Sequence, residues 1–301
     1  MFKYTDKIKN SAIYALLSAI VDYAGLFPPA KLEMRDAMTT YVQAQAAGYR
    51  WLLGHFVLPA SRLGEFEALL PKFPEQQWSL SVIVSSNTAQ DLEQLAAYQN
   101  DAVTIAALEF PVLSPAEIDR LGALIPTGID AFFELRLTGN LAPYLDSLQR
   151  RKTFAKIRMG GITPDAFPDV AAVSRFMLAC AQAKVPFKAT AGLHHPLPGQ
   201  HSLTYDNNSP SAAMHGFWNL AIAASLVYQQ EIALDAVLSL LKESSPDSFQ
   251  VQPEQIIWNR DSYHYTLATS ELQEARNHFF LSFGSCSIHE PVHDLIHFHW
   301  L

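Results

Sequence analysis

The chain has 301 residues, a formal charge of −8 and two cysteines. This charge would repel a phosphate backbone, and no basic stripe is interleaved with aromatic residues, so no nucleic-acid partner is expected. Two cysteines form neither a disulfide framework nor a CxxC site, which predicts a reducing, cytoplasmic location. Apolar runs fall short of the roughly 20 residues that span a bilayer. Asp22 follows the run Ala12–Val21 directly and no small-x-small cleavage site comes after it, so neither membrane association nor a secretory leader is expected.

Residues 1–50 are expected to form an extension with at least one helix that packs on the rest of the chain. After it, short β-branched and aromatic runs alternate with helical patterns, which is typical of βα units on a parallel sheet. The predicted strands are Trp51–Leu58, Trp78–Ser85, Val103–Phe110, Ile129–Leu137, Phe154–Gly160 and Phe187–Leu193. The predicted helices between them are Ala60–Leu70, Thr88–Tyr98, Pro115–Leu124, Leu141–Arg150 and Pro168–Ala183.

Beyond Leu193 the alternation becomes irregular. A Pro- and Asn-rich loop over His194–Pro210 precedes predicted helices at Phe217–Tyr228 and Leu234–Lys242. Phe249–Trp258 is the candidate seventh strand, and Phe279–Phe283 the strand that closes the ring. We therefore predict one domain over residues 1–301, a (β/α)₈ TIM-type barrel that is irregular in its last third, with an open doubly wound sheet as the alternative.

Charged residues occur inside three consecutive predicted strands, where a parallel sheet should be apolar on both faces. Because side chains alternate between faces, the charged residues of each strand share one face, and their apolar neighbours must pack on helices. The inward set is Glu134, Arg136, Lys156, Arg158, Lys188 and Thr190, with Glu109 ending the preceding strand. Four cations against two carboxylates predict a net positive interior and an anionic guest, and a closed ion-pair network that only fixes the fold is the alternative.

Two inward lysines favour carbonyl chemistry, because a lysine near another cation loses basicity and a free amine can form a Schiff base. The run from Lys188 to Gly192 resembles the Lys-Thr-Ser-Thr-Gly strand of deoxyribose-phosphate aldolases. The resemblance implies a (β/α)₈ barrel in which Lys188 is the Schiff-base residue and a second lysine lies beside it. Thr190 and Gly192 match this pattern, whereas Ala189 and Ala191 depart from it. In that family the second lysine lies on the strand after the Schiff-base strand, near paired glycines. In this chain the second inward lysine, Lys156, lies with Gly160-Gly161 on the strand before Lys188.

Further polar groups lie in predicted loops at the same end of the strands. Gly160-Gly161 precedes a predicted helix start at Thr163 and is either an anion-binding loop or a tight turn. The loop with Ser285 and Cys286 follows the last strand, where barrels commonly bind phosphate. Cys286 is also a candidate nucleophile, although no base is adjacent in sequence, and Cys180 is predicted to lie in the core.

Histidines supply the alternative chemistry. His194-His195 directly follows the sixth predicted strand, and Glu109, Glu134 and His194 form a candidate metal site. In the tail, His289, His293 and His297 recur every fourth residue. That spacing suits a metal, but a solvated helix face is the favoured interpretation.

The turn-rich stretch Val21–Pro29 has two possible roles. It either plugs one end of the barrel or contributes Asp22 and Tyr23 to the site.

Taken together, the sequence predicts an aldolase-like lyase that acts on a small anionic carbonyl compound and uses no cofactor. The expected catalytic residues are Lys188, Lys156 and Glu134. The expected substrate-binding residues are Arg136, Arg158, Glu109, Thr190, Gly160, Gly161, His194, His195, Ser285 and Cys286. A metal-dependent lyase or isomerase and a non-catalytic binding protein for an anion are the alternatives, and a homo-oligomer is compatible with each.

Overall fold

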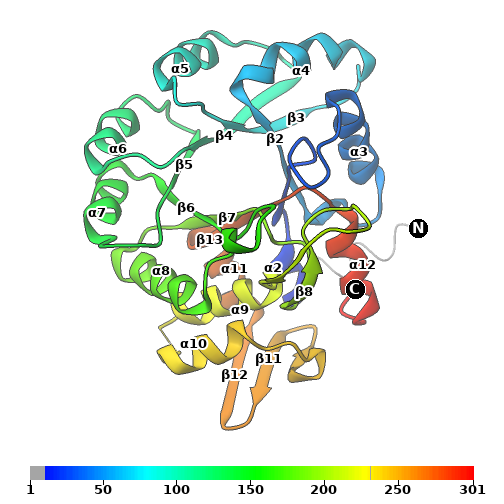
Figure 1. Cartoon of the computed structure of the whole chain (residues 1–301), viewed down its shortest axis with the longest axis vertical. Coiled ribbons are helices and arrows are strands. Elements are labelled where there is room, and N and C mark those ends of the chain that lie inside the picture. Colours follow the sequence, from blue (N-terminus) through cyan, green and yellow to red (C-terminus); the bar gives the residue numbers. More distant parts are fainter. Residues whose placement is uncertain (1–10, 231) are drawn as a thin grey trace.

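The computed structural model describes residues 11–230 and 232–301, so the first ten residues of the predicted N-terminal extension lie outside it. Within the described part, eight parallel strands close into a barrel with helices around it (Figure 1). In order around the ring they are β1 (Val21–Tyr23), β2 (Leu53–Pro59), β3 (Trp78–Ile83), β4 (Val103–Phe110), β5 (Asp130–Glu134), β6 (Phe154–Arg158), β7 (Phe187–Thr190) and β13 (Phe280–Ser285). The predicted TIM-type (β/α)₈ barrel is confirmed.

The helices follow the strands largely as predicted. They are α2 (Ala12–Leu17), α3 (Met34–Ala46), α4 (Leu63–Leu69), α5 (Thr88–Ala97), α6 (Pro115–Gly122), α7 (Ala142–Arg151), α8 (Val170–Ala183), α9 (Phe217–Tyr228), α10 (Leu234–Leu241), α11 (Thr269–His278) and α12 (His289–His297). Side chains that accept first-turn N–H groups fix some of the starts. For example, Ser114 accepts from Glu117 before α6, and Asp169 accepts from Ala172 before α8. Short 3₁₀ helices at Arg50–Leu52, Ala60–Arg62, Leu70–Lys72, Pro164–Ala166 and Pro246–Ser248 complete the connections.

The strand that completes the barrel is not the predicted Phe249–Trp258. That segment instead contributes to an antiparallel sheet of β10 (Phe249–Val251), β11 (Gln255–Arg260) and β12 (Tyr263–Ala268), which projects beyond α10 at one side of the barrel (Figure 1). The predicted loop after β7 also contains a strand, β8 (Gly199–Ser202), which pairs with β9 (Ser211–Met214).

The eighth barrel strand is β1, from the stretch that the sequence left open. Val21, Asp22 and Tyr23 pair in parallel with Phe283, Gly284 and Ser285 of β13, and Val21 also pairs with Leu53 of β2. This three-residue strand therefore closes the ring and carries Asp22 into the interior.

The apolar faces of the strands pack on the helices, as their alternation predicts. Phe187 of β7, for example, contacts Phe176 of α8 edge-on at 5.3 Å between ring centroids. Cys180 of the same helix is fully buried, as predicted. On α12, His289, His293 and His297 are all exposed, which agrees with the solvated-face interpretation.

Across residues 11–230 and 232–301, every helix is too short or too polar to cross a bilayer.

Candidate functional site

The ammonium group of Lys188 lies in the interior of the barrel. Its Nζ atom donates to Asp22 Oδ2 and to Glu109 Oε1, each at 2.6 Å, and the lysine side chain is fully buried. Asp22, Glu109 and Lys188 come from β1, β4 and β7, which are not neighbours in the ring. The Lys188 side chain therefore extends across the barrel interior to reach both carboxylates. It links β7 to β1 and to β4.

Glu109 continues this network toward the mouth of the barrel. Its second carboxylate oxygen lies 3.5 Å from Lys156 Nζ, which lies 3.2 Å from Glu134 Oε2. Arg158 Nε donates to Glu134 Oε1 at 3.1 Å. Glu134, Lys156 and Lys188 are opposite one another in adjacent strands, so the shared face that the sequence predicted for them is confirmed.

Hydroxyl and backbone donors complete the carboxylate contacts. Ser81 Oγ donates to Glu109 Oε1 at 2.8 Å, and Ser282 Oγ donates to Asp22 Oδ2 at 2.7 Å. The backbone N–H of His55 donates to the other oxygen of Asp22 at 2.9 Å. Asp22 is thus held in one orientation toward Lys188.

The network holds Glu109 and Lys188 in their charged forms. Burial alone would raise the pKa of Glu109, but the charges of Lys188 and Lys156 and the hydrogen bonds from Lys188 and Ser81 lower that pKa to about 2. Burial would likewise lower the pKa of Lys188, but the charges of Asp22 and Glu109 raise it above its ordinary value. The predicted lowering of the Lys188 pKa is therefore wrong, because two carboxylates contact its amine.

Charges in the interior balance, so the predicted excess of positive charge is also wrong. Arg136 is exposed and does not line the cavity, and Asp22 supplies a third carboxylate. The three carboxylates of Asp22, Glu109 and Glu134 then face three cations on β6 and β7. Arg158 is the cation of this set that reaches solvent, with 55% of its side chain exposed.

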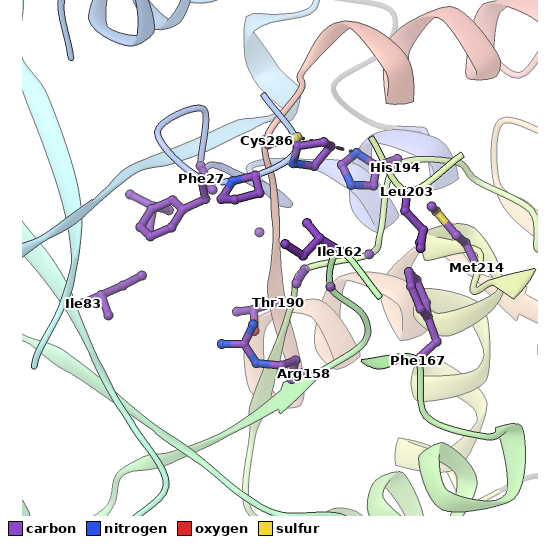
Figure 2. Close-up of a pocket in the computed structure, with 18 of the residues that line it drawn as sticks. Phe27, Ile83, Arg158, Ile162, Phe167, Thr190, His194, Leu203, Met214 and Cys286 are labelled. Carbon is purple, nitrogen blue, oxygen red and sulfur yellow. Dashed lines mark hydrogen bonds between the residues drawn. The ribbon is translucent and has the colours of Figure 1, made fainter. Parts of the chain in front are cut away.

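A cavity of about 410 Å³ opens above the network. Its polar wall includes Glu109, Glu134, Lys156, Arg158 and Thr190, and its apolar wall includes Phe27, Ile83, Ile162, Phe167, Leu203 and Met214. Figure 2 shows Arg158 and Thr190 on one side of this space and Cys286 with His194 on another. Lys188 is not among the lining residues, because its amine is enclosed between Asp22 and Glu109 beneath the cavity.

Gly160 and Gly161 have different positions. Gly161 lines the cavity, whereas Gly160 packs against Gly192 and Phe167. The predicted helix start after them is a single 3₁₀ turn, Pro164–Ala166, so no full helix directs its N-terminus at this loop. Close packing of two backbones explains Gly160, and Gly161 remains a candidate for contact with a ligand.

Replacing Gly192 by alanine is expected to lower the free energy of unfolding by about 2 kcal/mol or more. Gly192 has φ +67°, and an added Cβ would lie 2.8 Å from the Gly160 Cα and 2.9 Å from the Met159 carbonyl oxygen. Urea denaturation measures the loss. Gly128→Ala is the matched control, since Gly128 has φ +91° with open space around it. Equal losses in the two variants would contradict the close-packing explanation.

The loops that follow β7 and β13 form the upper wall of the cavity. His194 Nδ1 lies 3.0 Å from Glu290 Oε2 and 4.0 Å from Cys286 Sγ, and all three residues line the cavity. His195 lines it as well and pairs with Asp294 at 2.6 Å. Ser285 is buried within β13 and does not reach the cavity, so of the predicted pair Ser285-Cys286 only the cysteine lines it.

The predicted metal ligands do not come together. Glu109 and Glu134 contact lysines and arginine, and His194 contacts Glu290. In the part of the chain that the structure describes, no group of three His, Cys, Asp or Glu side chains is placed to hold a metal ion.

Several site residues were missed or left open by the sequence. Asp22 was left open because a three-residue strand shows no periodicity. Glu290 and Tyr205 were missed. Glu290 lies on α12, 96 positions from His194, and Tyr205 lies on the β8–β9 connection, in a stretch that the sequence presented only as a loop. The one signal for Glu290 was its position in the first turn of a helix that follows the last barrel strand.

Comparisons with protein-family models, curated proteins and solved structures gave no match for this chain. The site geometry is therefore the basis for the functional proposal.

Proposed function

We propose that this protein is an enzyme that binds a small anionic carbonyl compound in the barrel mouth and forms an iminium with Lys156. The observation that carries the proposal is the position of the two lysines: Lys156 lines the cavity, and Lys188 is enclosed beneath it. Lys156 thus takes the role that the sequence assigned to Lys188.

The neighbouring carboxylate supports the proton transfers that iminium formation requires. Glu134, 3.2 Å from Lys156 Nζ, can accept the proton that the ammonium loses before the amine attacks the carbonyl carbon. The N–C bond forms and a second proton moves from the nitrogen to the carbonyl oxygen, which becomes a hydroxyl group. Glu134 then returns its proton to this hydroxyl, and the oxygen leaves as water. The iminium carries the same positive charge as the ammonium it replaces, so the charge balance with Glu109 and Glu134 is preserved in the adduct.

Arg158 supports the anionic part of the proposal. Its guanidinium lines the cavity, is more than half exposed and has one carboxylate partner, Glu134. The remaining N–H donors can bind a carboxylate or phosphate group in a bidentate way. The apolar wall then faces the remainder of a small substrate.

Borohydride trapping tests the proposal. The protein is incubated with pyruvate, glyoxylate or dihydroxyacetone phosphate, reduced, and analysed by intact mass and peptide mapping. We expect one adduct per chain, on Lys156, and a lower yield with the neutral aldehyde acetaldehyde than with glyoxylate. Lys156→Met should abolish the adduct.

Trapping on Lys188, trapping spread over exposed lysines such as Lys31 and Lys72, or no adduct with any of these probes would each overturn the proposal. Binding of the anionic probes without an adduct would favour the non-catalytic binding protein.

A further inference from the structure

A second polar cluster lies in the upper wall of the cavity, apart from the lysine network. It consists of Cys286, His194, Glu290 and Tyr205, all of which line the cavity. Cys286 Sγ is 4.0 Å from His194 Nδ1 and 3.9 Å from the Tyr205 hydroxyl. The Tyr205 hydroxyl donates to Glu290 Oε1 at 3.1 Å, while Glu290 Oε2 faces His194 at 3.0 Å.

The fold brings these residues together from separate loops at the same end of the barrel. His194 follows β7 and Cys286 follows the neighbouring strand β13, while Glu290 lies in the first turn of α12. Figure 2 shows the contact between Cys286 and His194 at the edge of the cavity. The fold thus places beside Cys286 an imidazole that the adjacent sequence does not supply.

The charges of the cluster favour a protonated His194. Glu290 is an acceptor, so His194 Nδ1 carries a proton toward it. Burial alone would lower the pKa of His194, but the hydrogen bonds and charges of Cys286 and Glu290 raise it to about 9. The same N–H lies next to Cys286 Sγ, and an imidazolium beside a thiol stabilises the thiolate.

Glu290 and Cys286 meet the same nitrogen of His194. In a nucleophile–base–acid relay the base uses one nitrogen for each partner, so His194 does not relay a proton from Cys286 to Glu290. It acts instead as a fixed positive charge and proton donor beside the sulfur.

We propose that Cys286 and His194 form a thiolate–imidazolium pair, a second reactive centre that captures the aldehyde carbon of a small anionic compound as a thiohemiacetal. The Sγ–C bond forms, the π electrons of the carbonyl move to its oxygen, and His194 donates its proton to that oxygen. The step is reversible and needs no oxidant, reductant or further reactant. It shares its substrate class with the proposed function, but it requires no iminium on Lys156.

The chain contains its own control for this inference. Cys180, the other cysteine, is fully buried within α8, and burial raises the pKa of its thiol. Cys180 does not line the cavity. Any thiol reaction of the folded protein is therefore expected at Cys286 alone.

Alkylation by iodoacetamide tests the ion pair. The groups that face Cys286 are His194, Tyr205 and Tyr23, with Glu290 behind them. We expect one label per chain, on Cys286, at a rate that at pH 7 is about tenfold higher than in His194→Gln, because an ordinary thiol is only a few per cent thiolate at that pH. Cys286→Ser should remove the label, and Cys180→Ser should leave the rate unchanged.

The pH dependence of the iodoacetamide labelling rate provides results that could contradict the ion pair. The wild type and His194→Gln should differ in the pH dependence of the labelling rate, because only the wild type has an imidazolium beside the sulfur. Glu290→Gln, which leaves the imidazole in place, should shift the profile in the same direction as His194→Gln. Identical profiles in wild type and variants, or an unreactive Cys286, would overturn the ion pair.

Capture of an aldehyde is tested with glyoxylate that carries ¹³C at its aldehyde carbon. We expect a new NMR resonance of an sp³ carbon bonded to sulfur in the wild type and in Lys156→Met, and none in Cys286→Ser. A resonance that survives in Cys286→Ser, or its absence in the wild type, would overturn the capture. Because borohydride reports the iminium on Lys156 and this resonance reports Cys286, the two proposals can fail separately.

Discussion

Replacing Lys188 by methionine is expected to lower the free energy of unfolding by about 3–5 kcal/mol, because the change leaves two buried carboxylates without their shared cation. Methionine has a similar length, so the loss of packing is small. Asp22 and Glu109 both contact the Lys188 amine at 2.6 Å and are almost completely buried. Urea denaturation at pH 7 measures the effect.

An exposed ion pair of similar length provides the control. Arg62 Nε lies 2.7 Å from Glu65 Oε2, with 29% and 46% of the two side chains exposed. Arg62→Met should cost only about 0–1 kcal/mol. A loss for Lys188→Met as small as that of the control would show that the buried network contributes little. Adding Asp22→Asn and Glu109→Gln to Lys188→Met neutralises both carboxylates. This triple variant should recover part of the stability lost in Lys188→Met if unpaired charge is the cause.

The parity of side chains in the strands predicted the inward face of Glu134, Lys156 and Lys188, but it was wrong for Arg136, which lies beyond the end of β5 and is exposed. Six of the barrel strands contain long β-branched or aromatic runs, and their residues alternate between two faces. Glu134, Lys156 and Lys188 therefore had to share an inward face, and their register confirms it. Which carboxylate meets which lysine could not be predicted, because Asp22 and Glu109 reach Lys188 across the ring rather than along one strand.

The two errors in strand assignment have different physical origins. β1 has three residues, too few to show a period, and the pairing of Val21 with Phe283 and Leu53 defines it. β11 and β12, by contrast, are longer runs joined by the two residues Asp261 and Ser262, with φ +49° at Asp261. A two-residue connection between alternating runs predicts a hairpin, and this signal argues against placing Phe249–Trp258 in a parallel barrel.

The upper wall was the least predictable part of the site. Cys286 and His194 follow neighbouring strands of the closed ring, β13 and β7, although 92 positions separate them in sequence. The additional sheet and helices between these strands conceal that adjacency. Once β1 rather than Phe249–Trp258 is the eighth strand, β7 and β13 become neighbours, and the loops that follow them must meet.

The stability of the protein is expected to fall steeply as the pH drops from about 4.5 to about 2. The pKa of Glu109 is about 2 in the folded protein against an ordinary value of 4.5. The stabilisation by its charge is therefore fully present above about pH 4.5, and it is lost as the pH falls through about 2. A shift of this size corresponds to about 3 kcal/mol. The pKa of Asp22 is lowered as well, which adds to the loss.

Urea denaturation at several pH values between 2 and 7 measures this dependence, and Glu109→Gln isolates the contribution of one carboxyl group. The unfolded wild type binds a proton at Glu109 that the folded protein excludes, so between the two pKa values this group adds about 1.4 kcal/mol per pH unit to the slope. The amide in the variant does not titrate in this range. We expect the variant to be less stable than the wild type at pH 7 and the difference to shrink toward pH 2. Equal slopes for the two proteins would mean that Glu109 is not held in its charged form by Lys188 and Lys156, and the network would then not be the source of acid sensitivity.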